Sequence, residues 1–400
     1  MTGRILRQYL TASEVAVAMV LLVGASLMVH TMVRLGRTDT GFDSANTMTM
    51  SISLAGSQFA APERQQSFFD DVLSGVGALP GVMSAGLVNH VPIGGDTWRL
   101  DFAVEGSSGG GVLTTNPNAV FRVATPGYEK ALGLRLIEGR WFENTDRPNS
   151  PLVVVINELL ARRYWGPEDT EVKRLKLGTV DSEGPWLQVV GVVGDTAQSS
   201  VRQTPAPEIY FPYTQNPVSF WTDTNLVVRS ARDPAALGST LRDTVWTIDP
   251  NLPVSNLETL ADVLGSSLGQ QRFNTTLLAL LAAIALTLAL VGIYGVISYT
   301  VSQRRYEIGV RTALGAGTGD IVRLFLAQGM KPVLVGLGVG LLASLWLTRF
   351  ISSLLFGVGT TDPPTLALAA LLMATTALVA SHLPARAASR RDPLDALRSE

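Results

Sequence analysis

Four long apolar stretches stand out from the more mixed pattern of the rest of the chain. They cover about residues 15–33, about 275–301, the run PVLVGLGVGLLASLWLT with its approach from Ile321, and 364–383. Crossing a hydrocarbon core takes roughly 20 helical residues, and lipid offers the backbone no hydrogen-bond partner outside its own segment. The pattern therefore predicts transmembrane helices at 15–36, 273–301, 321–356 and 364–384.

The first stretch has a second interpretation, a cleaved signal peptide. Its apolar run is longer than the core of about 7–15 residues in such peptides. Arg34 and Arg37 follow it, in place of a closely following Ala-x-Ala-like site. We expect a retained membrane anchor.

The region between the first two helices, 37–272, alternates short β-like runs with Gly and Pro. Its clearest strands are at 152–156, 187–193 and 226–229, which predicts a folded α/β domain.

A repeated order of strand, helix, Pro turn and strand suggests how this domain is organised. A strand-like run at 47–54 and a helix-like stretch at 62–77 precede a Pro turn and another strand. The same order returns with 225–229 and 234–246 near the other end. We expect these two units to pair in one sheet, with about residues 126–205 forming a second, more β-rich lobe. The fold class is then an α-helical membrane protein with four transmembrane helices, in a 1+3 arrangement, and an inserted α/β extracytoplasmic domain of two lobes.

Arginine in the short flanks predicts the orientation, because Arg and Lys accumulate on the cytoplasmic side. The flanks that carry it are the N-terminus, the connection after the second helix and the C-terminal tail, with Arg4, Arg7, Arg304, Arg305, Arg311, Arg323, Arg386, Arg390, Arg391 and Arg398. Segments 1–14, 302–320 and 385–400 are therefore predicted to be cytoplasmic, and 37–272 and 357–363 to lie outside. Only Arg34 and Arg37 oppose this assignment. The chain would be a multi-pass protein of the cytoplasmic (inner) membrane with both termini inside.

Composition supports a membrane protein without a catalytic site. The chain is 46% hydrophobic and 16% charged, whereas soluble domains carry about 25% charged residues. Its net charge of -2 gives no reason to expect nucleic acid as a partner. There is no cysteine, the three histidines are far apart, and no Gly-x-x-x-x-Gly-Lys-Ser/Thr run is present. We expect no metal, no cofactor and no nucleotide site, and membrane lipid as the surroundings.

Two features within the apolar stretches have modest interpretations. His30 and His382 lie near predicted helix ends, where snorkelling or a local hydrogen bond accounts for them. Gly336 and Gly340 are spaced as Gly-x-x-x-Gly, which lets two helix backbones approach closely. That face serves either packing within one chain or contact between the subunits of a dimer.

The richest local pattern lies between the second and third apolar stretches, at 303–323. Ile308, Arg311, Thr312 and Gly315 recur at helical spacing in a short basic segment. From physics alone, such a segment follows the positive-inside rule or rests on anionic headgroups.

The same segment resembles the signature of the MacB/FtsX-type permease superfamily, the type VII ABC transporter permeases. That signature, Arg-Glu-Ile-Gly-x-Arg-x-Ala-Leu-Gly-Ala, is matched at 306–316, with Tyr306 in place of the first Arg. The tail LPARAASRRDPLDALR at 383–398 resembles the family's ending, and the order of helices and outer domain also matches. Residues 13–16 and 41–43 are most similar to one unit of the acidobacterial duplicated orphan permeases. The chain would be one such unit, stand-alone or half of a longer chain, without an ATPase domain.

This resemblance implies a permease that is not itself an enzyme and that works with a separate ABC ATPase subunit. ATP-driven closure of the ATPase would move the cytoplasmic segment, and the helices would relay this movement to the outer domain. The residues that would contact the ATPase are Arg304, Arg305, Glu307, Gly309, Arg311, Leu314 and Gly315. Arg311 would face acidic groups of the partner, and Leu314 would fill an apolar groove.

Further partners follow from the same resemblance. They are a second permease unit, identical or similar, and a periplasmic adaptor. The function would be export of a substrate or its extraction from the outer leaflet. The alternative is an FtsX-like signalling scaffold that switches an extracytoplasmic partner such as a cell-wall hydrolase.

Overall fold

The computed structural model describes most of the chain. It covers residues 2–59, 61–94, 97–105, 117–165, 173–179, 181–198, 200, 205–215, 223–304, 311, 317–350, 355, 359 and 361–389. These residues form two compact units, each described by itself below. The sheet unit is residues 38–268, and the helical unit is residues 1–37 together with 269–400.

The sheet unit contains one connected sheet of 11 strands in the order β11-β1-β10-β2-β4-β3-β7-β8-β6-β9, with β5 paired to β8. The strands are β1 Thr47–Ser53, β2 Val82–Val88, β3 Arg99–Val104, β4 Asn118–Ala124, β5 Leu136–Gly139, β6 Val153–Asn157, β7 Arg174–Leu177, β8 Leu187–Val193, β9 Glu208–Pro212, β10 Asp223–Ser230 and β11 Val254–Thr259. The helices are α2 Pro62–Gly77, α3 Tyr128–Leu132, α4 Glu158–Tyr164, α5 Gly238–Ile248 and α6 Leu260–Ser267, with short 3-10 turns at Tyr213–Gln215 and Pro234–Leu237.

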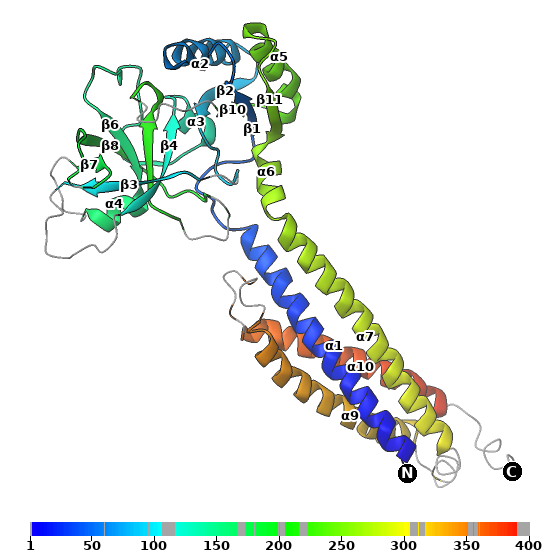
Figure 1. Ribbon diagram of the computed structural model, residues 1–400. Coiled ribbons are helices and arrows are strands. Elements are labelled where there is room, and N and C mark those ends of the chain that lie inside the picture. Colours follow the sequence, from blue (N-terminus) through cyan, green and yellow to red (C-terminus); the bar gives the residue numbers. More distant parts are fainter. Residues whose placement is uncertain are drawn as a thin grey trace. The chain divides into compact units, whose positions relative to one another are not determined.

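The predicted pairing of the two repeated strand–helix–Pro–strand units is confirmed. β1 lies between β10 and β11, and β10 also pairs with β2, all antiparallel. Figure 1 shows α2 and α5 together beside these strands. Alternate residues of β1, namely Met48, Met50 and Ile52, are buried with the apolar faces of the two helices. Strands and helices from opposite ends of the unit thus share one core.

The middle of the unit is rich in strands, as expected, but the strand-rich part begins before residue 126. β3 and β4 already belong to it, and β4 runs parallel to β9. Its connection to the first group of strands is narrow, because β2 and β4 pair at the single position Val88↔Ala124.

A buried ion pair holds β4 to β9. The Arg122 guanidinium donates to the Glu208 carboxylate, and their side chains are 1% and 0% exposed. Thr196 Oγ1 also donates to Glu208, at 2.9 Å. Burial opposes the charge of Arg122, and the neighbouring Glu208 carboxylate more than offsets this, so the pKa of Arg122 lies above its ordinary value. The neighbouring Tyr128 is fully buried, and burial raises the pKa of its phenol as well.

Removing one member of this pair should destabilise the strands it joins. Arg122→Met leaves the Glu208 carboxylate buried without its cation, which costs about 3–5 kcal/mol. We expect backbone amides of β4 and β9 in the full chain to exchange hydrogen about a hundred to several thousand times faster. The double variant Arg122→Met/Glu208→Met, with no buried charge left, should recover most of the protection. Exchange in the single variant that stays at the wild-type rate would show that an unpaired Glu208 carboxylate does not destabilise these strands.

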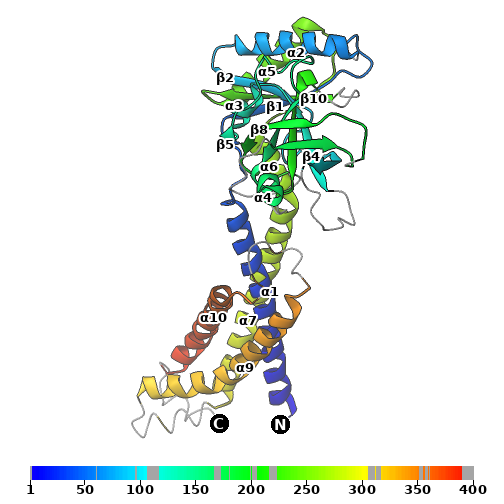
Figure 2. The ribbon, with the colours of Figure 1, turned by 90° about the vertical axis from the view of Figure 1, so that its left-hand side faces the viewer.

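The described residues of the helical unit contain four long helices. They are α1 Thr2–Leu35, α7 Gly269–Gln303, α9 Thr318–Leu347 and α10 Pro363–Ser389. Each contains a stretch long and apolar enough to cross a membrane, at Leu6–Leu35, Gly269–Gln303, Gly329–Leu347 and Pro363–His382. α1 packs against α7, α9 and α10, and Figure 2 shows the bundle from a second side. α9 ends at Leu347 rather than at 356, and α10 continues to Ser389.

Candidate functional site

The spaced glycines of α9 lie against α1 of the same chain. A Cβ added at Gly336 would come within 2.5 Å of the Ala12 carbonyl oxygen. At Gly340 it would come within 2.7 Å of Met19 Cβ and 2.9 Å of the Ala16 carbonyl oxygen. A real Cβ would clash at these distances. Because glycine has none, the two helix backbones can come into close contact at both positions. Among the described residues, this face of α9 is covered by α1.

A second close approach joins α1 to α7. A Cβ at Gly292 would lie 2.0 Å from a carboxylate oxygen of Glu14. That oxygen, Oε2, is buried and has no hydrogen-bond partner among the described residues. An acidic residue at the edge of the first apolar stretch is the one sequence signal for this contact, and it does not identify Gly292 as the neighbour.

The end of α7 is also attached to α1. The Arg7 guanidinium lies 3.9 Å from the ring centroid of Tyr299, a cation–π contact. The Tyr299 hydroxyl accepts a hydrogen bond from Gln303 Nε2 at 2.7 Å. The last turn of α7 is thus held to the first turns of α1, immediately before the segment expected to couple to the ATPase.

The structure describes two of the seven residues expected to contact the ATPase. Arg304 follows α7, and its backbone N–H donates to the Val301 carbonyl at 3.2 Å. Arg311 is exposed. The other five residues lie outside the described residues; they are Arg305, Glu307, Gly309, Leu314 and Gly315.

A small polar cluster links α1 to the start of α10. His30 Nδ1 lies 3.3 Å from Thr365 Oγ1 and 3.3 Å from Asp362 Oδ2. The Asp362 carboxylate also accepts from the backbone N–H of Thr365 at 3.3 Å, as a helix cap does. Hydrogen bonding from Thr365 lowers the pKa of the Asp362 carboxyl. His30 therefore takes part in a local hydrogen-bonded cluster, one of the two interpretations given above.

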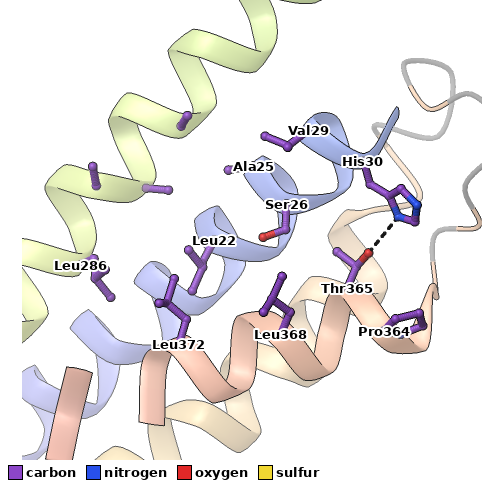
Figure 3. Close-up of a pocket in the computed structure, with 13 residues that line it drawn as sticks. Leu22, Ala25, Ser26, Val29, His30, Leu286, Pro364, Thr365, Leu368 and Leu372 are labelled. Carbon is purple, nitrogen blue, oxygen red and sulfur yellow. Dashed lines mark hydrogen bonds between the residues drawn. The ribbon is translucent and has the colours of Figure 1, made fainter. Parts of the chain in front are cut away.

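A cavity of about 540 Å³ lies beside this cluster, between α1, α7 and α10 (Figure 3). Leu22, Leu286 and Leu368 line it, and the polar groups of Ser26, His30 and Thr365 lie toward one end in the close-up. A lining of this kind suits a hydrocarbon chain with one polar end better than a polar ligand. Among the described residues, no group of three or more His, Cys, Asp and Glu is placed to hold a metal ion.

Two family matches cover most of the chain. Residues 10–244 match the MacB-like periplasmic core domain, and residues 279–393 match the FtsX-like permease C-terminal domain. The chain belongs to the MacB/FtsX-type permease family. The resemblance found at 306–316 and in the tail is therefore confirmed at the level of the family.

Curated relatives of this permease include two export proteins. The macrolide export ATP-binding/permease protein MacB of Marinobacter nauticus is 27% identical over 272 residues, which are 66% of this chain and 41% of the relative. The pyoverdine export ATP-binding/permease protein PvdT of Pseudomonas putida is 28% identical over 278 residues, or 66% of this chain and 40% of the relative. The permease thus spans about two-fifths of the length of these relatives.

Among solved structures, the periplasmic region of MacB from Actinobacillus actinomycetemcomitans is similar over 58% of this chain and 97% of that one. The sequence identity is 15% and the TM-score is 0.37, which is too low to add to the family assignment.

The glycine contact of this permease predicts a position-specific response in α9. Gly340→Leu forces a side chain into α1, and overpacking of this kind costs about 1–3 kcal/mol. We expect a lower unfolding temperature of the full chain in detergent. Gly338→Leu is the matched control, because a Cβ at Gly338 meets nothing within 4 Å. Equal loss of stability in both variants would contradict packing of α9 on α1 through Gly340.

Proposed function

We propose that this chain is the permease subunit of an ABC transporter that works by mechanotransmission. A separate ATPase closes on ATP, the membrane helices relay the movement, and the domain outside the membrane does work on a substrate. The observation that carries this proposal is the pair of family matches, one over a periplasmic core domain and one over a permease domain, in a single chain. The relatives named for macrolide and pyoverdine export support export, or extraction from the outer leaflet, as the kind of work.

The helices suit such a relay. α7 has 35 residues and is therefore about 52 Å long, whereas a hydrocarbon core is about 30 Å thick. Only Leu268 separates α7 from α6, which follows directly on β11. In the chain, α6 and α7 therefore make up nearly all of the segment between the last strand of the sheet unit and Arg304. The attachment of α7 to α1 through Gly292 and Tyr299 would make the two helices move together.

The proposed arrangement in the cell follows the charge pattern. Both termini and 302–320 face the cytoplasm, one membrane helix precedes the two-lobed outer domain, and three follow it. The protein would reside in the cytoplasmic (inner) membrane, as a dimer of identical or similar permease units, with a periplasmic adaptor as a further partner. Membrane lipid would fill the cavity beside His30.

The coupling segment gives the sharpest test. Leu314→Asp places a charge where the proposal requires an apolar contact, at a cost on the order of a few kcal/mol. We expect an ATP-binding subunit to co-purify with the wild-type chain from native membranes in mild detergent, and to be lost with the variant.

Met83→Asp is the control, because it adds the same charge at an apolar side chain of the sheet unit that is 67% exposed. It should leave the ATPase bound. An ATPase that remains with Leu314→Asp would show that the coupling segment is assigned wrongly. A cell-wall hydrolase that co-purifies in place of an adaptor would instead indicate the signalling scaffold.

A further inference from the structure

The sheet unit contains a polar cavity of about 630 Å³ that the proposed function does not use. Its size lies within the range of about 300–1,000 Å³ that small-molecule sites occupy. Side chains of β1, β10 and β11 form one side of it, the segment after β2 and Trp98 form another, and α6 contributes a third. All of these elements belong to the sheet unit (Figure 1).

The face of β1 that lines the cavity is the one opposite the hydrophobic core. Ser51 Oγ donates to Asn225 Oδ1 at 2.7 Å and accepts from Asn256 Nδ2 at 3.2 Å. Ser53 Oγ donates to Asp223 Oδ1 at 2.6 Å. β1 and β10 each have a paired strand on both sides, so their backbone groups are not open to strand addition. A ligand here is recognised by hydroxyl, amide and carboxylate side chains rather than as an extended peptide.

Asn89 supplies a buried donor without an acceptor. The residue is 2% exposed, and its Oδ1 accepts from the Val123 N–H at 2.9 Å, which assigns the other atom as the amide nitrogen. That nitrogen, Nδ2, has no hydrogen-bond partner among the described residues. A buried unmade hydrogen bond costs about 1–3 kcal/mol, so this donor destabilises the wall of the cavity that Asn89 lines.

Backbone strain coincides with the same cavity. Among the described residues, the non-glycine residues with positive φ are Ile93, at 63°, and Asn256, at 49°, and both line it. A β-branched residue such as isoleucine seldom adopts this conformation, and such strain clusters at functional sites. The wall that carries Ile93 is held in place, since its N–H donates to the Gln198 carbonyl and the His90 carbonyl accepts from Arg122.

The charges and the aromatic ring narrow the class of ligand. Asp223 and Glu258 line the cavity, and no lysine or arginine does so among the described residues, so an anionic ligand is disfavoured. Hydroxyl-bearing ligands match the serines and asparagines, because a hydroxyl both donates and accepts. Trp98 offers an apolar ring face at the wall, and its centroid lies 4.6 Å from that of His90. We propose that this cavity is a binding site for an amino-sugar oligomer, with one ammonium near Asp223 and another near Glu258, because these residues pair with Ser53 and Thr49 at different positions along β1.

The test uses the full-length chain in detergent, with the disaccharide of two glucosamine units as the probe and calorimetry as the readout. We expect saturable binding of one disaccharide per chain. The N,N′-diacetylated disaccharide, which has no ammonium group, should bind at least about tenfold more weakly. Asp223→Asn and Glu258→Gln should each weaken binding of the charged probe and leave the acetylated one unchanged.

A blocking variant and its control complete the design. Ser266→Trp on α6 fills the cavity and should abolish binding, whereas Ala261→Trp, exposed on the same helix and not part of the lining, should not. Binding that survives Ser266→Trp and both charge-removing variants would overturn the proposal, as would a folded wild-type chain with a Kd weaker than about 10 mM.

Leu314→Asp should bind the probe as the wild type does. A failure of ATPase coupling is therefore distinguishable from a failure of this site.

Discussion

The antiparallel pairing of β1 with β10 is the contact on which the sheet unit depends. The two strands come from opposite ends of the unit, with Thr47 opposite Arg229 and Ser53 opposite Asp223. Closing so long a loop costs conformational entropy, but that cost grows only slowly with length. Once formed, the pair places Met48, Met50 and Ile52 in the core. The same alternation leaves Ser51 and Ser53 on the opposite face, so one strand builds both the hydrophobic core and the polar side of the cavity.

The helical unit obeys a different constraint. Lipid tails are as apolar as leucine, so helices in a bilayer gain little from burying leucine against each other. Close backbone contact has to supply the attraction. Gly336 and Gly340 allow it between α9 and α1, and Gly292 allows it between α7 and α1. α1 is therefore the common partner of α7, α9 and α10, although it is separated from them in the sequence by the whole sheet unit.

Local sequence patterns predicted much of this fold. The helix at 62–77 and the strand at 187–193 coincide with α2 and β8, because Pro62 opens the helix and valines dominate the strand. The repeated strand–helix–Pro–strand order predicted which strands pair, since both copies must bury the same apolar face. The partnership of Arg122 with Glu208 could not be predicted this way, because β4 and β9 meet only through the parallel pairing of distant strands. The cavity beside Asn89 was missed for the same reason: its walls come from four separate segments.

For the expected coupling residues, the sequence is more informative than the structure. Their assignment comes from the family motif, and among the seven only Arg304 and Arg311 belong to the described chain. What the structure adds is the order of the helices that precede them. α6 lines the polar cavity and is followed, after Leu268, by α7, which ends beside Arg7 and Arg304. Under the proposed relay, a ligand that favours one position of α6 and an ATPase that favours one position of the segment after Gln303 would act on consecutive helices of the chain. Coupling free energy is reciprocal, so ATPase closure that alters the cavity requires that the ligand alter ATPase binding by the same factor.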